Sequence, residues 1–87
     1  MNKFAISQNA MSKQLGDETI ILHLSSGTYF GLNAVGTRFW RLIGEGKDLD
    51  QIYETISGEY EVSLKDLERD IVQLINDLVS QDLITLP

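Results

Sequence analysis

The sequence predicts an α+β fold in which a small antiparallel sheet comes first and three helices follow. Two short β-rich runs surround the turn residues 25–27 ("SSG"), a pattern typical of a hairpin. Three amphipathic segments come next, and each is preceded by a good helix cap: Asn33, Asp48 and Ser63. Because the chain has 87 residues, 43% of them apolar and 23% charged, we expect residues 1–87 to form a single domain.

The strand predictions depend on short apolar runs separated by turn residues. Residues 10–15 are expected to form the first strand, and residues 18–24 ("ETIILHL") show the clearest strand pattern. Residues 28–32 ("TYFGL") form the third strand, at one edge if the strands pair in sequence order. Residues 1–10 are expected to be loosely ordered. The tail "LITLP" is either a short closing strand or a segment that packs on the sheet.

The helix predictions combine caps with apolar residues at helical spacing. Asn33 begins a helix that runs to about Ile43. Asp48 begins the second helix, with Gln51 as its capping-box partner, and Ser63 begins the third. The apolar arc of the third helix spans about 160°, wider than the roughly 100° stripe of an ordinary surface helix. In content this set of elements is winged-helix-like, with the three-stranded antiparallel sheet moved to the N-terminal side.

The composition argues against several classes of protein. A formal charge of −6, with only 7 Lys and Arg residues, disfavours binding to nucleic acid or to an anionic membrane surface. The absence of cysteine excludes disulfides and thiolate chemistry. No apolar run approaches the roughly 18 residues of a membrane span, and the N-terminal residues lack the apolar core of a signal peptide. We therefore expect a cytoplasmic protein.

Candidate catalytic groups are sparse. His23 is the one histidine, and its place in an alternating strand favours a strand-face role over a catalytic triad. The acids within residues 45–50 lack the spacing of an EF-hand and are interpreted as a solvated helix start. The glycines within residues 27–36 do not match a phosphate-binding loop. The sequence therefore predicts no catalytic residue, no metal site and no cofactor.

Two features favour a binding module instead. The strand "TYFGL" carries neither a charge nor a proline, which are the usual protections of a sheet edge. The apolar arc of the third helix is wider than packing against the core requires. If that margin lies beside the edge, the two form a groove where an extended peptide can pair with the strand and rest side chains on the helix. The alternative is that the tail "LITLP" fills this groove, and the residues alone leave both open.

The order and spacing of these segments resemble the PqqD-like family, the peptide-recognition domains of ribosomal natural-product pathways, also called RiPP recognition elements. The resemblance covers about residues 12–84. Within the family, "YFGLN-x-VG" is most similar to the small stand-alone proteins of lasso-peptide biosynthesis. The segments that carry the resemblance are the hairpin "LHLSSGTYFGLN", the helix "N-x-V-G-x-x-F-W-x-L-I", the "L-x-x-I" helix opening at Leu49 and the ending "DIVQLINDLVSQDLI".

The resemblance implies a non-catalytic role. Such proteins bind the leader segment of a precursor peptide as an added strand and deliver it to a leader peptidase or another modifying enzyme. It stays open whether the peptide faces the margin of the third helix that carries Leu67 and Leu74 or the opposite margin, which carries Val72 and Val79. The residues implied for peptide binding are Thr28, Tyr29, Phe30, Gly31 and Leu32 on the strand and Leu67, Asp70, Ile71, Leu74 and Asp77 on the helix, with Arg69 at the rim.

Two alternative functions stay open beside this one. A winged-helix transcription regulator would need a basic third helix, whereas this segment has Lys65 and Arg69 against several aspartates and glutamates. A structural subunit of a larger synthetase would need no peptide site. The oligomeric state also stays open between a monomer and a weak or swapped dimer, because an uncovered edge strand can pair with itself.

Overall fold

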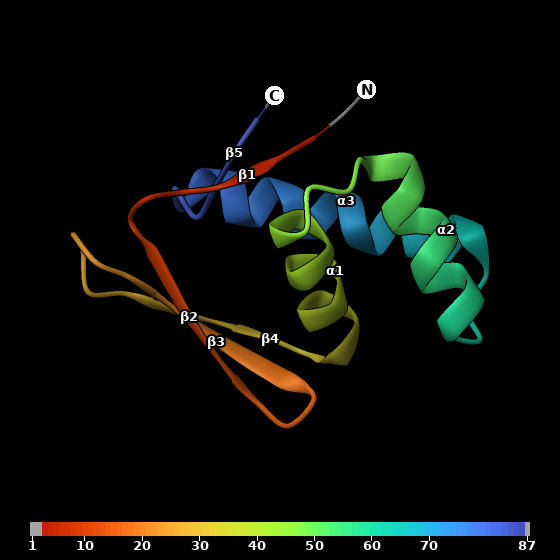
Figure 1. Ribbon diagram of the computed structural model, residues 1–87, viewed down its shortest axis with the longest axis horizontal. Helices are drawn as coiled ribbons and strands as arrows, with labels where there is room; N and C mark the ends of the chain where they lie inside the picture. Colours follow the sequence, from red (N-terminus) through yellow and green to blue (C-terminus); the bar gives the residue numbers. More distant parts are fainter. Residues whose placement is uncertain (1–2, 87) are drawn as a thin grey trace.

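A computed structural model describes residues 3–86 and places an antiparallel sheet before three helices, so the predicted α+β fold class is confirmed. The strand order is β2-β3-β4, which leaves β4 at one edge, as predicted. In Figure 1 the sheet extends to the lower left of α1 and α2 lies to its right, while α3 runs across the upper part of the view. The elements are β2 (Ala10–Leu15), β3 (Glu18–His23), β4 (Tyr29–Leu32), α1 (Ala34–Gly44), α2 (Leu49–Glu59) and α3 (Leu64–Ser80).

A second, two-stranded sheet joins the two ends of the chain. Strand β1 (Ala5–Ile6) pairs antiparallel with β5 (Ile84–Thr85), and the Ser7 amide donates to the Leu83 carbonyl at 3.0 Å. The expectation of loose order over residues 1–10 is therefore wrong for β1, although residues 1 and 2 lie outside the described part. The prediction that the tail forms a short closing strand is confirmed by β5. Leu83 and Ile84 are buried, and β5 packs against α3.

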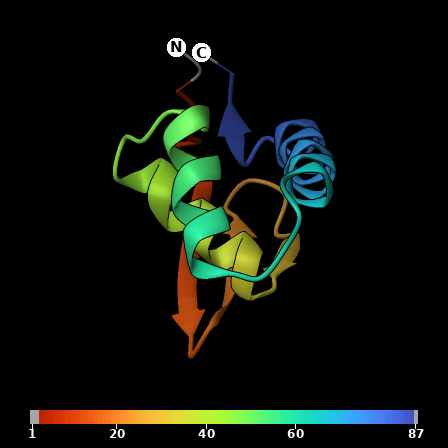
Figure 2. The same ribbon diagram turned by 90° about the vertical axis from the view of Figure 1, so that its right-hand side faces the viewer.

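The three helices begin at the caps that the sequence predicts. The Asn33 side chain accepts a hydrogen bond from the Gly36 amide, and the Ser63 side chain accepts one from the Asp66 amide. Asp48 and Gln51 form the complete capping box. Figure 2 shows α3 nearly end-on beside α1 and α2. No helix within residues 3–86 is both long enough and apolar enough to cross a bilayer.

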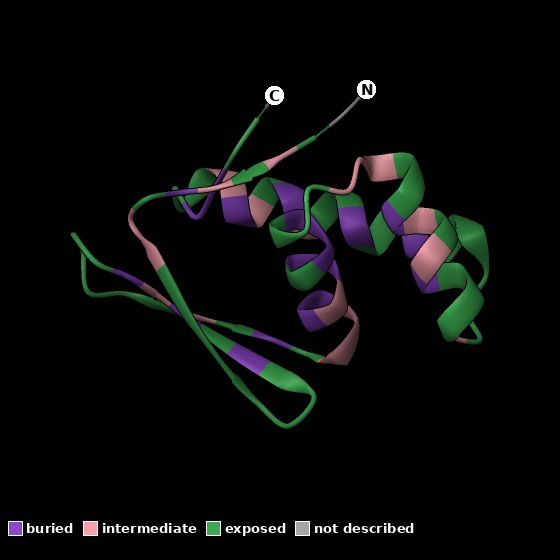
Figure 3. Ribbon diagram, in the orientation of Figure 1, coloured by how far each residue is buried: buried purple, intermediate pink, exposed green. Residues whose placement is uncertain are grey.

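The core lies between the inner face of the sheet and the helices. Along β3, Thr19, Ile21 and His23 are buried, while Ile20 between them is 41% exposed, so the strand alternates as a half-buried strand should. Figure 3 shows buried segments on α1, α2 and α3 and an exposed β2. The largest fully buried side chains are Phe39, Ile21, Leu42, Ile52, Ile56, Ile71, Leu78, Leu83 and Ile84.

A buried hydrogen bond connects β3 to α1. The Thr19 hydroxyl donates to the Thr37 hydroxyl at 2.8 Å, and both residues are 3% exposed. We expect Thr37→Val to lower the free energy of unfolding by about 1–2 kcal/mol, because it leaves the buried Thr19 hydroxyl without its acceptor. Urea denaturation followed by Trp40 fluorescence measures this change. The double variant Thr19→Val/Thr37→Val should cost less than the two single variants summed, and strict additivity would contradict a direct bond.

Candidate functional site

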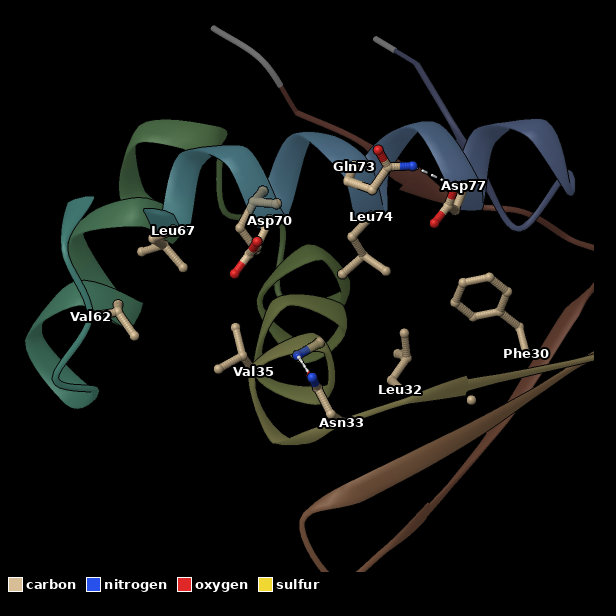
Figure 4. Close-up of a pocket in the computed structure, with 13 residues that line it drawn as sticks. Phe30, Leu32, Asn33, Val35, Val62, Leu67, Asp70, Gln73, Leu74 and Asp77 are labelled. Atoms are coloured by element: carbon tan, nitrogen blue, oxygen red, sulfur yellow. Dashed lines mark hydrogen bonds between the residues drawn. The ribbon is translucent and has the colours of Figure 1, made fainter. Parts of the chain in front are cut away.

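A groove of about 330 Å³ separates the edge strand β4 from α3. Figure 4 shows that its side chains converge from both elements and from the start of α1. The groove therefore lies where the uncovered edge meets the wide apolar helix. Its lining residues are Phe30, Gly31, Leu32, Asn33, Val35, Gly36, Val62, Leu67, Asp70, Ile71, Gln73, Leu74 and Asp77.

The floor of the groove is apolar. Leu67 and Ile71 are buried at its base, and Leu74 is half-buried and points from α3 toward the strand (Figure 4). On the opposite margin of α3, Val72 is 49% exposed and does not line the groove. The structure thus brings the Leu67–Leu74 margin, and not the Val72 margin, to face β4.

The starts of α1 and α3 both border the groove. A Cβ atom at Gly36 would lie 3.2 Å from the Leu32 Cβ atom, so any larger residue there would have to push Leu32 aside by a few tenths of an ångström. At the start of α3, Val62 precedes the cap Ser63, and Leu67 is the fourth residue of α3. These are the two positions of a hydrophobic staple, and both residues line the groove.

The helix rim of the groove is acidic. Asp70 and Asp77 both line it, and the Gln73 side-chain amide donates to the Asp77 carboxylate at 3.0 Å. Arg69 lies outside the groove, with nitrogen atoms 3.5 Å from Asp66 and 3.6 Å from Asp70. These pairs are exposed to solvent and contribute little to stability. The groove thus combines an apolar floor with two carboxylates beside it.

The free edge of β4 presents backbone groups at alternate residues. The His23 amide donates to the Thr28 carbonyl at 2.9 Å, and Ile21 is the register partner of Phe30. In an antiparallel ladder bonded pairs alternate with non-bonded pairs, so Phe30 bonds to β3 while Tyr29 and Gly31 direct their N–H and C=O groups outward. Within residues 3–86 no further strand pairs with this edge.

Most of the residues predicted for the site line the groove. Thr28 precedes β4 and contributes its carbonyl to the hairpin, while the Tyr29 side chain is 70% exposed and, like Arg69, does not line the groove. An apolar residue just before the cap, paired with one at the fourth helix position, is the sequence signal that predicts contact between Val62 and the start of α3. The lining residues that the sequence analysis missed are Asn33, Val35, Gly36, Val62 and Gln73.

His23 acts as a structural connection between the hairpin and the end of α3. Its Nδ1 atom accepts a hydrogen bond from the Ser26 amide at 3.1 Å, so in the neutral ring Nε2 carries the proton and donates to Asp82 at 3.1 Å. The Asn9 side chain also donates to Asp82, at 2.9 Å. This cluster connects the hairpin that carries β4 to the segment between α3 and β5.

The hydrogen bonds to the Asp82 carboxylate predict that the stability of the fold decreases at acid pH. Hydrogen bonds from Asn9 and then from His23 hold the pKa of Asp82 below its ordinary value. The ionised form therefore stabilises the fold above the unfolded-state pKa of about 3.9, and this contribution disappears as the pH falls through the lower folded-state pKa. Asp82 has a φ of 58°, which asparagine tolerates, so Asp82→Asn retains the backbone conformation.

We expect Asp82→Asn to be less stable than the parent protein at pH 5, with a difference that shrinks toward zero as the pH falls below about 4. Urea denaturation of both proteins between pH 5 and pH 2.5 measures the difference. A gap that stays constant over this range would show that the charge of Asp82 does not contribute.

Comparison with known proteins agrees with this architecture. Residues 18–84 match the family model described as coenzyme PQQ synthesis protein D (PqqD). TbiB1, solved in complex with the TbiA(beta) leader peptide, is 41% identical, and the alignment covers 92% of this chain and 93% of that chain with a TM-score of 0.86.

A lasso peptide synthetase B1 complexed with the leader peptide is 24% identical, with a TM-score of 0.85 over 95% of this chain and 98% of that chain. At this identity the likeness concerns the fold alone. No curated protein sequence matches the chain. The family match and the relation to TbiB1 both extend over most of the chain, and they confirm the resemblance expected from the sequence. The chain therefore belongs to the PqqD family.

Proposed function

We propose that this protein binds the leader segment of a ribosomally made precursor peptide as an additional strand on β4, as a RiPP recognition element of lasso-peptide biosynthesis. It then presents the peptide to a leader peptidase or another modifying enzyme and catalyses no step itself. The observation that carries the proposal is the free β4 edge, with the outward backbone groups of Tyr29 and Gly31, beside an apolar groove.

The backbone of the edge supplies affinity in this proposal. Tyr29 and Gly31 together offer two donors and two acceptors, and each bond contributes about 0.5–1.5 kcal/mol net. A strand of 4 residues pairs with about 13 Å of extended peptide. Because backbone bonds are independent of side chains, the edge orients the peptide without selecting its sequence.

The groove supplies selectivity. Alternate side chains of an added strand point toward α3, where Leu67, Ile71 and Leu74 offer apolar contact. Asp70 and Asp77 favour a peptide with basic residues beside its apolar ones. TbiB1, the relative with 41% identity, was solved with the TbiA(beta) leader peptide, which supports a peptide of this class as the ligand.

The test is a fluorescence-polarisation titration with labelled TbiA(beta) leader peptide. An external label is needed because Trp40 is 5% exposed and donates to Ser12 at 3.0 Å, away from the groove. Saturable binding at micromolar concentration or below, displaced by unlabelled leader but not by a scrambled peptide, is the expected result. Absence of binding up to about 100 μM, which corresponds to roughly −5.5 kcal/mol, would contradict the proposal.

A further inference from the structure

Gly31 has no conformational or steric reason within the chain to be a glycine. It lies inside β4, its φ is not positive, and a Cβ atom built there meets nothing within 4 Å. Gly27 and Gly36 differ, because Gly27 has a φ of 74° and Gly36 packs against Leu32. Glycine weakens a strand interior and often marks a place where a ligand approaches closely. The missing side chain is therefore explained best by a contact from outside.

A second depression opens beside Gly31. It has a volume of about 280 Å³ and shares Gly31, Leu32 and Asn33 with the groove, so the two are continuous around β4. Ile20, the register partner of Gly31, forms its apolar wall and is 41% exposed. By strand alternation Glu18, Ile20 and Gly31 face outward, away from α3, while Thr19 and Leu32 are buried on the inner face. The depression therefore opens on the outer face at the edge of the sheet, with the Glu18 carboxylate at its border.

An added strand would place one side chain at this depression. Because the backbone of Gly31 points to the free edge, a peptide residue can bond directly to it. Side chains directly opposite each other in neighbouring strands point to the same face, whichever direction the peptide runs. The side chain of the peptide residue opposite Gly31 therefore lies on the outer face. Because Gly31 has no side chain, this peptide side chain can extend over its backbone and contact Ile20.

We propose that this outer depression is a second side-chain subsite, and that Gly31 selects a large apolar residue at the peptide position opposite it. A large side chain that covers a glycine on a sheet edge recovers the apolar burial that the glycine lacks. The inference rests on the proposed function and extends it. Peptide recognition then uses both faces of the added strand, the groove on one side and the Gly31 depression on the other.

The test is an alanine scan of labelled TbiA(beta) leader peptide against the parent protein and Gly31→Val. With the parent protein, one peptide position at an odd separation from the groove-facing positions should lose at least fivefold in affinity on substitution by alanine. Gly31→Val should bind the unsubstituted leader at least tenfold more weakly, because the valine blocks access to Ile20. It should bind the alanine peptide as well as it binds the unsubstituted one. Gly31→Ala should lie between.

Controls separate binding from folding. Valine prefers strands, so Gly31→Val should melt at the same temperature as the parent protein or higher. Gly58→Ala changes another glycine with open surroundings, on α2 and away from the groove, and should leave leader affinity unchanged. Ile20→Ser should bind the unsubstituted leader at least threefold more weakly than the parent protein does. Its affinity for the alanine-substituted leader should equal that of the parent protein.

The outcomes distinguish this inference from the proposed function. If the parent protein binds the leader and Gly31→Val binds it equally or more tightly, the outer subsite is wrong and leader binding stands. If the parent protein binds no leader, the proposed function fails and the subsite fails with it.

Discussion

Replacing Tyr29 by proline is expected to weaken binding of the TbiA(beta) leader peptide at least thirtyfold while the protein stays folded. Proline has no N–H, so the substitution removes one of the donors that β4 directs to its free edge. It removes no bond to β3, because the alternating ladder leaves Tyr29 unbonded on that side. Thirtyfold corresponds to about 2 kcal/mol, the effect of one lost hydrogen bond together with the crowding of the proline ring.

A matched variant separates the backbone from the side chain. Tyr29→Val keeps the N–H and changes only the exposed ring, so its leader affinity should stay within about threefold of the parent value. Circular dichroism and thermal melting verify that both variants fold. Parent-like binding by Tyr29→Pro would show that the peptide does not pair with β4. If that variant also failed to assemble with the modifying enzyme, a structural subunit would become the better interpretation.

Replacing Phe39 by alanine should lower the free energy of unfolding by about 3–5 kcal/mol, the largest effect on stability that we predict. Phe39 is fully buried in α1, between the sheet and the other helices. Its loss leaves a cavity that the neighbouring side chains fill only in part. Because domains are stabilised by only about 5–15 kcal/mol in total, the variant will be close to unfolding at ordinary temperature.

Urea denaturation with Trp40 fluorescence measures this loss, because burial of the indole makes it sensitive to unfolding. Arg41 lies on the same helix and is exposed, so Arg41→Ala is the control and should change stability by less than about 0.5 kcal/mol. A loss below about 1 kcal/mol for Phe39→Ala would contradict the packing of α1 described above.

Local patterns accounted for most of the secondary structure. Each helix begins at a side chain that accepts a hydrogen bond from an amide three residues further along, at Asn33, Asp48 and Ser63. Such bonds join neighbours in the chain, so the sequence shows both partners at once. The strand pattern of residues 18–24 and the uncharged edge "TYFGL" are local in the same sense, and they predicted β3 and β4 almost to the residue.

Contacts between distant segments were the part that local patterns missed. Strands β1 and β5 have only 2 residues each and lie at opposite ends of the chain, so neither shows an alternating pattern that reveals the other. The groove likewise includes Val35 and Val62, which look like ordinary apolar residues of a helix and a connection. They become lining residues because α1 begins beside Leu32 and α3 crosses above it.

The sequence by itself therefore determined the order of the elements, the caps, the edge strand and the excess of apolar surface on α3. It left open which margin of α3 faces β4 and whether the tail covers that edge. Tertiary packing decided both. The burial of Ile71, Ile75 and Leu78 in the core sets the rotation of α3 and directs Leu67 and Leu74 to the groove. The pairing of β5 with β1 holds the tail away from the free edge of β4.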